Sequence, residues 1–168
     1  MTRRFKPPIY ASTRRGVTTW TLNLGDDERA VVSRLLAELR ELVDEADAES
    51  ESPLLRRLFP PAYTDHDEHE AEYQRLMREE LVSSRLAGID AIDRHLGADA
   101  GDQLDEGEVV ALMQSLNAVR VVLGTMLDVG EDDDDVGEPG DEHEPERQLY
   151  GYLSWLVDWT VRSLQSTT

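Results

Sequence analysis

The sequence predicts a mainly α protein, a helical bundle of five or six helices with a small N-terminal β-hairpin. From about residue 25 onward, apolar residues recur every three or four positions, which is the periodicity of amphipathic helices. Before that point, β-branched and aromatic residues flank a turn that contains glycine, as in a hairpin. The 168 residues suffice for one domain, since domains of roughly 100–150 residues are the commonest. We therefore expect an arm and hairpin over residues 1–24, packed on a single helical domain over residues 25–168.

The hairpin is predicted by residues 9–22. Residues 9–12 and 17–22 have the composition of strands, and residues 13–16, which end in glycine, separate them. A two-stranded hairpin is marginally stable on its own. We therefore expect it to pack against the helices that follow.

Two helices are expected in the first half of the chain. Three acids follow Gly25 and favour a helix start there through the helix dipole, and this helix should fade in the acidic run 44–51. Ser52 and Pro53 are typical of a second start, for a short helix that reaches about Leu58 and is ended by a proline pair. The apolar face of the first helix comprises Val32, Leu35, Leu36, Leu39, Leu42 and Val43.

The next predicted helix is the longest. It begins near Asp65 or Asp67 and continues to Gly97, because glycine often caps a helix C-terminus. At about thirty residues it exceeds the usual length of helices in globular proteins, which is about 10–14. We therefore expect a bend or break near residues 78–80.

The clearest helix start lies at Asp105. Its side chain can accept a hydrogen bond from the backbone of Glu108 while the Glu108 side chain reaches back, which is a capping box. The helix should extend to about residue 127, and a last helix should cover about residues 146–165. Between them, the acidic run 128–146 lacks apolar surface, so we expect it, like the run 44–51, to be a mobile loop.

Charge and composition exclude several classes of function. The chain has 36 acidic and 17 basic residues, a net charge of −19, of which the first 24 residues carry +5 and the rest −24. This balance argues against sequence-independent binding to DNA or to anionic membranes. The absence of cysteine excludes disulfides, Cys-ligated zinc and thiol chemistry. No apolar run reaches the roughly 18–20 residues that cross a bilayer and no secretion signal is evident, so we expect a cytoplasmic protein.

The sequence contains no readable catalytic constellation. The four histidines are scattered, no phosphate loop follows a strand, and the many acids form pairs by chance. His66 and His69 are three residues apart, so both could face one metal ion on a helix. Acids at a helix start are already explained by the dipole, so we expect neither metal nor cofactor and no enzymatic activity.

We expect the protein to act through contacts with a partner protein rather than through catalysis, and three surfaces are candidates for these contacts. They are the basic N-terminal arm, the segment that follows the second helix start, and the aromatic pair of the last helix. The alternatives are that the arm folds back on the acidic bulk and that the aromatic pair lies in the core. The candidate residues are Arg3, Arg4, Arg14, Arg15, Arg56, Arg57, Tyr63, Trp155 and Trp159.

Three polar residues lie within apolar helical stretches. They are Arg85, Asn117 and Arg120. We expect structural roles for them, with an arginine satisfied by an acid and the asparagine bonding across helices. A role in binding a partner is the alternative.

Three segments together resemble an actinobacterial family, the AosR-like proteins, long catalogued as a domain of unknown function. Residues 53–63 (PLLRRLFPPAY) are similar to its "LRRLLPDAY" segment, and residues 116–127 (LNAVRVVLGTML) to its "LNDLRLALGTRLG" helix. Residues 149–156 (LYGYLSWL) match its closing "YDWLTWLQ" helix. The order and spacing of these motifs make the resemblance specific.

The resemblance implies a cytoplasmic regulator without catalytic activity. Its partners would be RNA polymerase and sigma factors in stress or sulfur-metabolism transcription, although a cysteine-based switch cannot operate in this chain. Family members are often encoded near the proteolytic adaptor ClpS, so an accessory role in proteolysis is the alternative, and a metal-binding protein or enzyme built on His66 and His69 is one of another class. An apolar helix face would also allow a homodimer.

Overall fold

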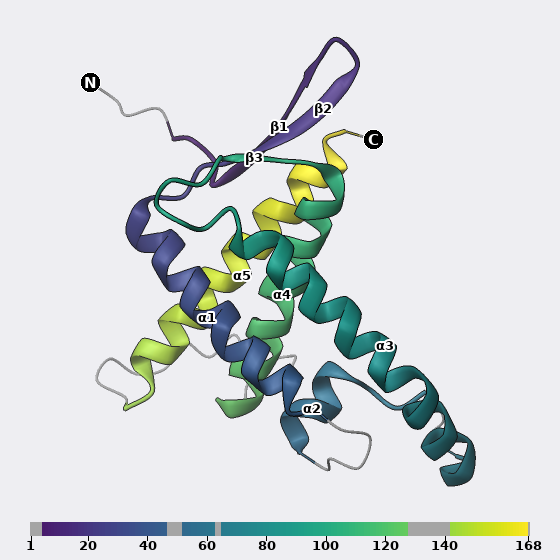
Figure 1. Ribbon diagram of the computed structural model, residues 1–168. Helices are drawn as coiled ribbons and strands as arrows, with labels where there is room; N and C mark the ends of the chain where they lie inside the picture. The colour runs from purple at the N-terminus through teal and green to yellow at the C-terminus, as the bar shows by residue number, and fades with distance from the viewer. Residues whose placement is uncertain (1–4, 47–51, 63–64, 128–141, 168) are drawn as a thin grey trace.

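The computed structural model describes residues 5–46, 52–62, 65–127 and 142–167, and within them the fold is mainly α (Figure 1). The described residues form five helices and a small antiparallel sheet, which confirms the predicted fold class. The helices are α1 (Asp26–Asp44), α2 (Pro53–Leu58), α3 (Asp67–Asp93), α4 (Glu106–Met126) and α5 (Glu144–Gln165). The strands are β1 (Ile9–Arg14), β2 (Val17–Leu22) and β3 (Gln103–Leu104).

The N-terminal hairpin forms as predicted, but β1 is two residues longer than the expected 9–12, so the turn has two residues in place of four. Ile9 pairs with Leu22 and Arg14 pairs with Val17. The turn residues have positive φ angles, 52° at Arg15 and 79° at Gly16, which is the backbone conformation that matches the twist of a tight hairpin. The third strand, β3, pairs with β2 on the edge away from β1 and was not predicted from the sequence.

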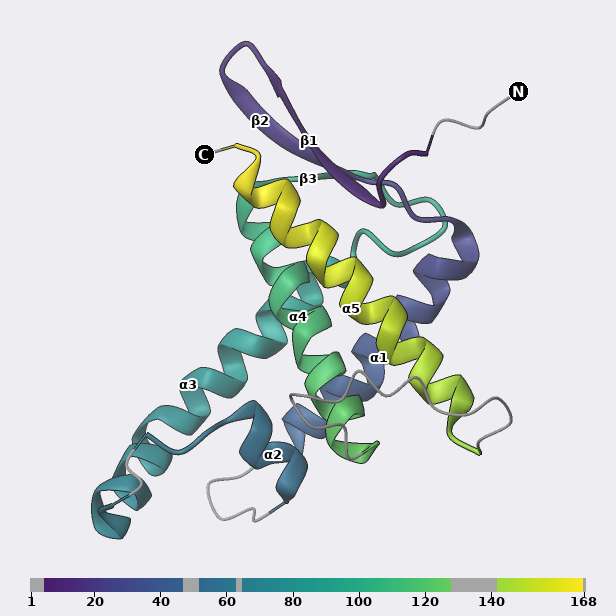
Figure 2. The same cartoon turned by 180° about the vertical axis from the view of Figure 1, so that it is seen from behind.

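One end of the hairpin is anchored in the core and the other projects from the bundle. Trp20 is 2% exposed, and its indole N–H donates a hydrogen bond of 3.3 Å to the Ser163 carbonyl oxygen on α5. Ile9 and Leu22 are buried beside it. The turn end reaches beyond the helices in both views (Figures 1 and 2). The hairpin is therefore fixed to the core at one end, and its turn is exposed to solvent at the other.

Helix α4 is the centre of the bundle. It contacts each of the other four helices and β2. Among the described helices, α4 alone is long and apolar enough to cross a bilayer, which corrects the expectation that no segment would be. Its packing is that of a core helix, because buried positions such as Leu112 and Leu116 contribute to the main hydrophobic core.

Helix α3 differs from its prediction in two ways. It is unbroken through residues 78–80, because it contains no proline, and its only glycine, Gly88, lies a further two turns along. It ends at Asp93 rather than at Gly97, since the backbone then tightens into turns in which the N–H groups of His95 and Leu96 bond to carbonyls three residues earlier. Its N-terminal half extends beyond the other helices in both views (Figures 1 and 2).

The two acidic runs fall largely outside the described residues, which exclude 47–51 and 128–141. At the end of the second run, residues 144–146 are helical, so α5 begins two residues earlier than expected. Pro145 lies in the first turn of α5, where its missing N–H is no loss.

Candidate functional site

The hairpin tip is the first of the predicted partner surfaces. Arg14 and Arg15 are exposed there, next to Val17, whose side chain is 64% exposed. Residues 9–22 contain no acid, so the hairpin is cationic on a strongly acidic chain. Arg3 and Arg4, predicted to act with this tip, lie outside the described residues.

The predicted aromatic surface on α5 is only partly open. Trp155 is 39% exposed, and its ring centroid lies 5.8 Å from that of Tyr152. Trp159 packs against the core, and Phe5 covers it with a centroid distance of 5.7 Å. The guanidinium of Arg162 lies 5.8 Å from the Trp159 ring. Trp155 is therefore the more accessible of the pair.

The two candidate metal ligands lie at the start of α3. His66 is its N-cap, His69 is in its first turn, and their ring centroids are 5.2 Å apart. Both side chains are exposed. Within the described parts of the chain, no group of three or more His, Asp or Glu side chains is arranged to hold a metal ion. The arrangement offers a metal two imidazoles and no third described ligand.

The polar residues of the helix interiors interact differently from what was expected. Asn117 accepts a hydrogen bond of 2.8 Å from Arg120 of the same helix, not from a neighbouring one. Arg85 is half-buried, and in the described residues it has no hydrogen bond or ion pair. Its guanidinium carbon lies 5.6 Å from the Phe59 ring centroid, and burial lowers the pKa of this guanidinium. Arg85 is a cation without a carboxylate partner in the described structure.

Arg85 and Asn117 lie in the wall of one groove between α2, α3 and α4, with a volume of about 460 Å³. Arg57, at the end of α2, also lines it, whereas Arg56 does not and Tyr63 lies outside the described residues. The groove thus gathers three residues that sequence reasoning had assigned to two separate roles. Its lining comprises Arg57, Leu58, Phe59, Pro60, Tyr73, Gln74, Leu81, Ser84, Arg85, Gly88, Ala111, Gln114, Ser115, Asn117, Ala118 and Val121.

The groove differs from the rest of the protein in charge. Its described lining contains two arginines and no Asp or Glu, although the chain has 36 acids. Glu70 is linked to the groove through Gln74, which donates to it at 2.6 Å. The other oxygen of that carboxylate accepts from the Ala62 N–H at 2.8 Å. Both oxygens of Glu70 are therefore occupied.

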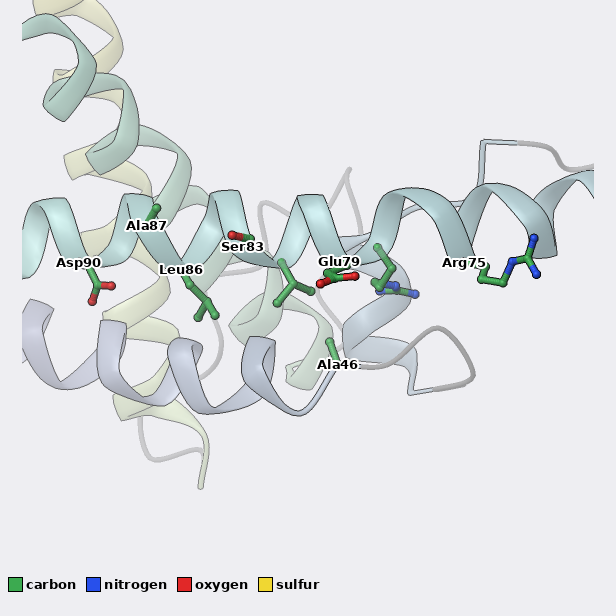
Figure 3. Close-up of a pocket in the computed structure, with 9 residues that line it drawn as sticks. Ala46, Arg75, Glu79, Ser83, Leu86, Ala87 and Asp90 are labelled. Carbon is green, nitrogen blue, oxygen red and sulfur yellow. The ribbon is translucent and has the colours of Figure 1, made fainter.

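A second hollow lies on another face of α3, near the end of α1 (Figure 3). Its volume is about 620 Å³, and it is lined by charges of both signs, including Arg75, Glu79 and Asp90. Asp90 is already engaged in an ion pair with Arg40 of α1. Because its charges balance, this hollow favours no particular ligand.

Sequence reasoning missed the groove because its parts come from three helices. One signal was present in the sequence: the positions three and four residues from Arg85 on either side are Leu81, Val82, Gly88 and Ile89, so no acid can pair with it along α3. Which residues would face it across the bundle was not readable. Phe59, whose ring centroid lies 5.6 Å from its guanidinium carbon, is 26 positions away in the sequence.

Comparison with known protein families gives a match over nearly the whole chain. The model of a family described as "Domain of unknown function (DUF2017)" matches residues 2–164. No curated protein and no solved structure matches the chain.

Proposed function

The chain belongs to the DUF2017 family, and on this premise we propose that it is a non-enzymatic cytoplasmic protein that regulates through protein–protein contacts. The observation that carries the proposal is the β1–β2 hairpin. The hairpin projects from the bundle and is anchored in the core by the buried Trp20. Its turn exposes Arg14 and Arg15. A rigid cationic element on an acidic protein suits the recognition of an acidic protein surface.

RNA polymerase or a sigma factor is the partner that we propose. The support is the resemblance of residues 53–63, 116–127 and 149–156 to the AosR-like proteins. A chain without cysteine cannot use a thiol switch, so its regulation would depend on binding. We propose no tight direct binding to DNA, because a net charge of −19 repels phosphate.

Affinity capture from cells of the native organism tests this function. The bait is the full chain, compared with R14E/R15E and with R34E/R75E, a matched double charge reversal at exposed positions of α1 and α3. We expect wild type and R34E/R75E to recover RNA polymerase or a sigma factor and R14E/R15E to lose it.

Three outcomes would contradict parts of the proposal. Equal recovery by R14E/R15E would remove the hairpin as the contact. Recovery of ClpS or protease subunits in place of polymerase would favour the proteolytic alternative. Recovery of neither under several growth conditions would leave the regulatory function without support.

A further inference from the structure

We propose that the groove between α2, α3 and α4 binds a short acidic peptide segment of a partner protein, whose carboxylate pairs with Arg85. This inference rests on the proposed function, in that it adds a second and chemically defined contact. The α2 wall of this groove lies at the opposite end of the bundle from the hairpin (Figures 1 and 2). The two sites can therefore be tested separately.

The first observation that supports the proposal is that Arg85 is half-buried and has no carboxylate partner in the described residues. A guanidinium that is half-buried loses hydration, and this cost is normally offset by a carboxylate and hydrogen bonds. The described residues give Arg85 only the Phe59 ring, at 5.6 Å. That ring already has a closer cation, Arg78, whose guanidinium carbon lies 4.5 Å from its centroid. The Phe59 ring therefore compensates the burial of the Arg78 guanidinium more than that of Arg85.

The second support is the length of the groove and the polar groups along it. Its lining residues on α3, from Tyr73 to Gly88, span about 22 Å at the helical rise of 1.5 Å per residue. An extended peptide of about six residues has a similar length. The groove carries the carboxamides of Gln114 and Asn117, which can bond to the N–H and C=O groups of a peptide backbone. A small organic acid would leave most of these groups unused.

The walls of the groove fit the side chains that flank an acidic residue. Leu58, Leu81 and Val121 line it, and apolar surface of this kind stabilises a peptide that buries alternate side chains. One acid, Glu70, lies next to the lining through its hydrogen bond with Gln74, whereas the charged residues of the described lining itself are Arg57 and Arg85.

Selection from a phage library of random twelve-residue peptides, on the immobilised full chain, tests the proposal. We expect the enriched peptides to share an Asp or Glu. A synthetic copy of an enriched peptide should bind at least tenfold more weakly when that residue becomes Asn or Gln, and at least tenfold more weakly to R85Q. R75Q, on the same helix but outside the groove, should bind within twofold of wild type.

A second variant guards against misfolding of R85Q. Ser84 is exposed and lines the groove, so S84W should fill it and abolish peptide binding without changing Arg85. Amide NMR spectra of each variant show whether it is folded. R14E/R15E should bind the peptide as wild type does, so failure here is distinguishable from failure of the hairpin contact.

Four results would overturn the proposal. They are the absence of any enriched peptide, enriched peptides without an acid, unchanged binding to R85Q or to S84W, and binding of benzoate alone to the same site as tightly as the peptide. The last result would make the groove a site for small acids.

Discussion

His95 Nε2 lies 2.8 Å from Glu108 Oε1, which ties the turn after α3 to the first turn of α4. The other oxygen of the same carboxylate accepts from the backbone N–H of Asp105 at 2.9 Å. The Glu108 N–H in turn donates to the Asp105 side chain at 2.8 Å. One carboxylate therefore serves both the capping box of α4 and a contact with His95, which sequence reasoning did not foresee.

The capping box predicts a loss of stability when Asp105 is removed. Asp105→Ala leaves the N–H of Glu108 without its acceptor, and we expect the free energy of unfolding to fall by about 1 kcal/mol. Urea denaturation followed by circular dichroism measures it. Asp105→Asn, which retains an acceptor oxygen, is the control and should lose less; equal losses would show that the cap does not stabilise α4.

Glu108 also predicts a dependence of stability on pH. Partial burial raises the pKa of its carboxyl, but hydrogen bonds from His95 and the Asp105 N–H, with the charges of His95 and Arg94, outweigh burial and lower it below 4.5. A carboxyl whose pKa falls on folding stabilises the protein above its unfolded pKa. That contribution is lost as the pH drops through the lowered folded pKa.

Glu108→Gln isolates this contribution, because glutamine can still accept from Asp105. We expect wild type to be more stable than the variant at pH 6 and the difference to shrink as the pH falls below 4.5. Urea unfolding of both proteins at pH 6, 4.5 and 3.5 measures the difference. A difference that stayed constant over this range would mean that the charge of Glu108 contributes nothing.

Helix positions were predictable from the sequence because the evidence for them is local. The apolar repeat of α1 and the pairing of Asp105 with Glu108 depend on residues within a few positions of one another. The expected break in α3 was wrong because it was inferred from length alone, whereas residues 78–80 (Arg-Glu-Glu) are good helix formers. The strand β3 has two residues, too few for any periodicity.

The candidate groove was not predictable in this way. Phe59 lies near both Arg78 and Arg85, and these contacts join a turn after α2 to the middle of α3. Such tertiary contacts leave no periodic trace in one sequence. What could be predicted was each polar residue singly, and for Asn117 the expected partner on another helix proved to be Arg120 on its own.

The contacts of Trp20 predict that its substitution weakens the attachment of the hairpin to the bundle. Trp20→Phe keeps an apolar ring but removes the hydrogen bond to Ser163 and leaves a cavity among buried residues. We expect the free energy of unfolding to fall by about 1–3 kcal/mol. Trp155→Phe is the matched control, since Trp155 is 39% exposed, and should change stability by less than about 0.5 kcal/mol. Similar losses in both variants would contradict the anchoring role.

Substitutions at two helical glycines should change folding stability in opposite directions. Gly151 on α5 is exposed, and a Cβ there would meet no atom within 4 Å, so Gly151→Ala should raise the free energy of unfolding by about 0.5–1 kcal/mol. At Gly124 on α4, a Cβ would lie 3.0 Å from the Tyr150 ring. Gly124→Val should therefore lower stability by about 1–3 kcal/mol. Thermal unfolding of the two variants tests the pair, and a destabilised Gly151→Ala would contradict the open position.

Arg29 joins three backbone segments. Among the partly exposed arginines, we expect its substitution to cause the largest loss of folding stability. Its guanidinium donates to the carbonyl oxygens of Leu24 at 3.1 Å, of Leu22 at 2.9 Å, and of His95. Arg29→Met keeps much of the apolar stem but removes all three bonds, so we expect a loss of about 2 kcal/mol in the free energy of unfolding.

Lysine should not replace Arg29, because its single ammonium cannot reproduce the planar fork that reaches three acceptors. We therefore expect Arg29→Lys to recover less than half of the loss measured by urea denaturation for Arg29→Met. Arg34→Met is the control: Arg34 forms an exposed pair with Glu38 at 4.0 Å, worth about 0.5 kcal/mol or less. If Arg29→Met cost no more than Arg34→Met, the three carbonyl bonds would be exchanged for water without loss, and the junction of β2, α1 and the turn after α3 would have to be held by apolar packing alone.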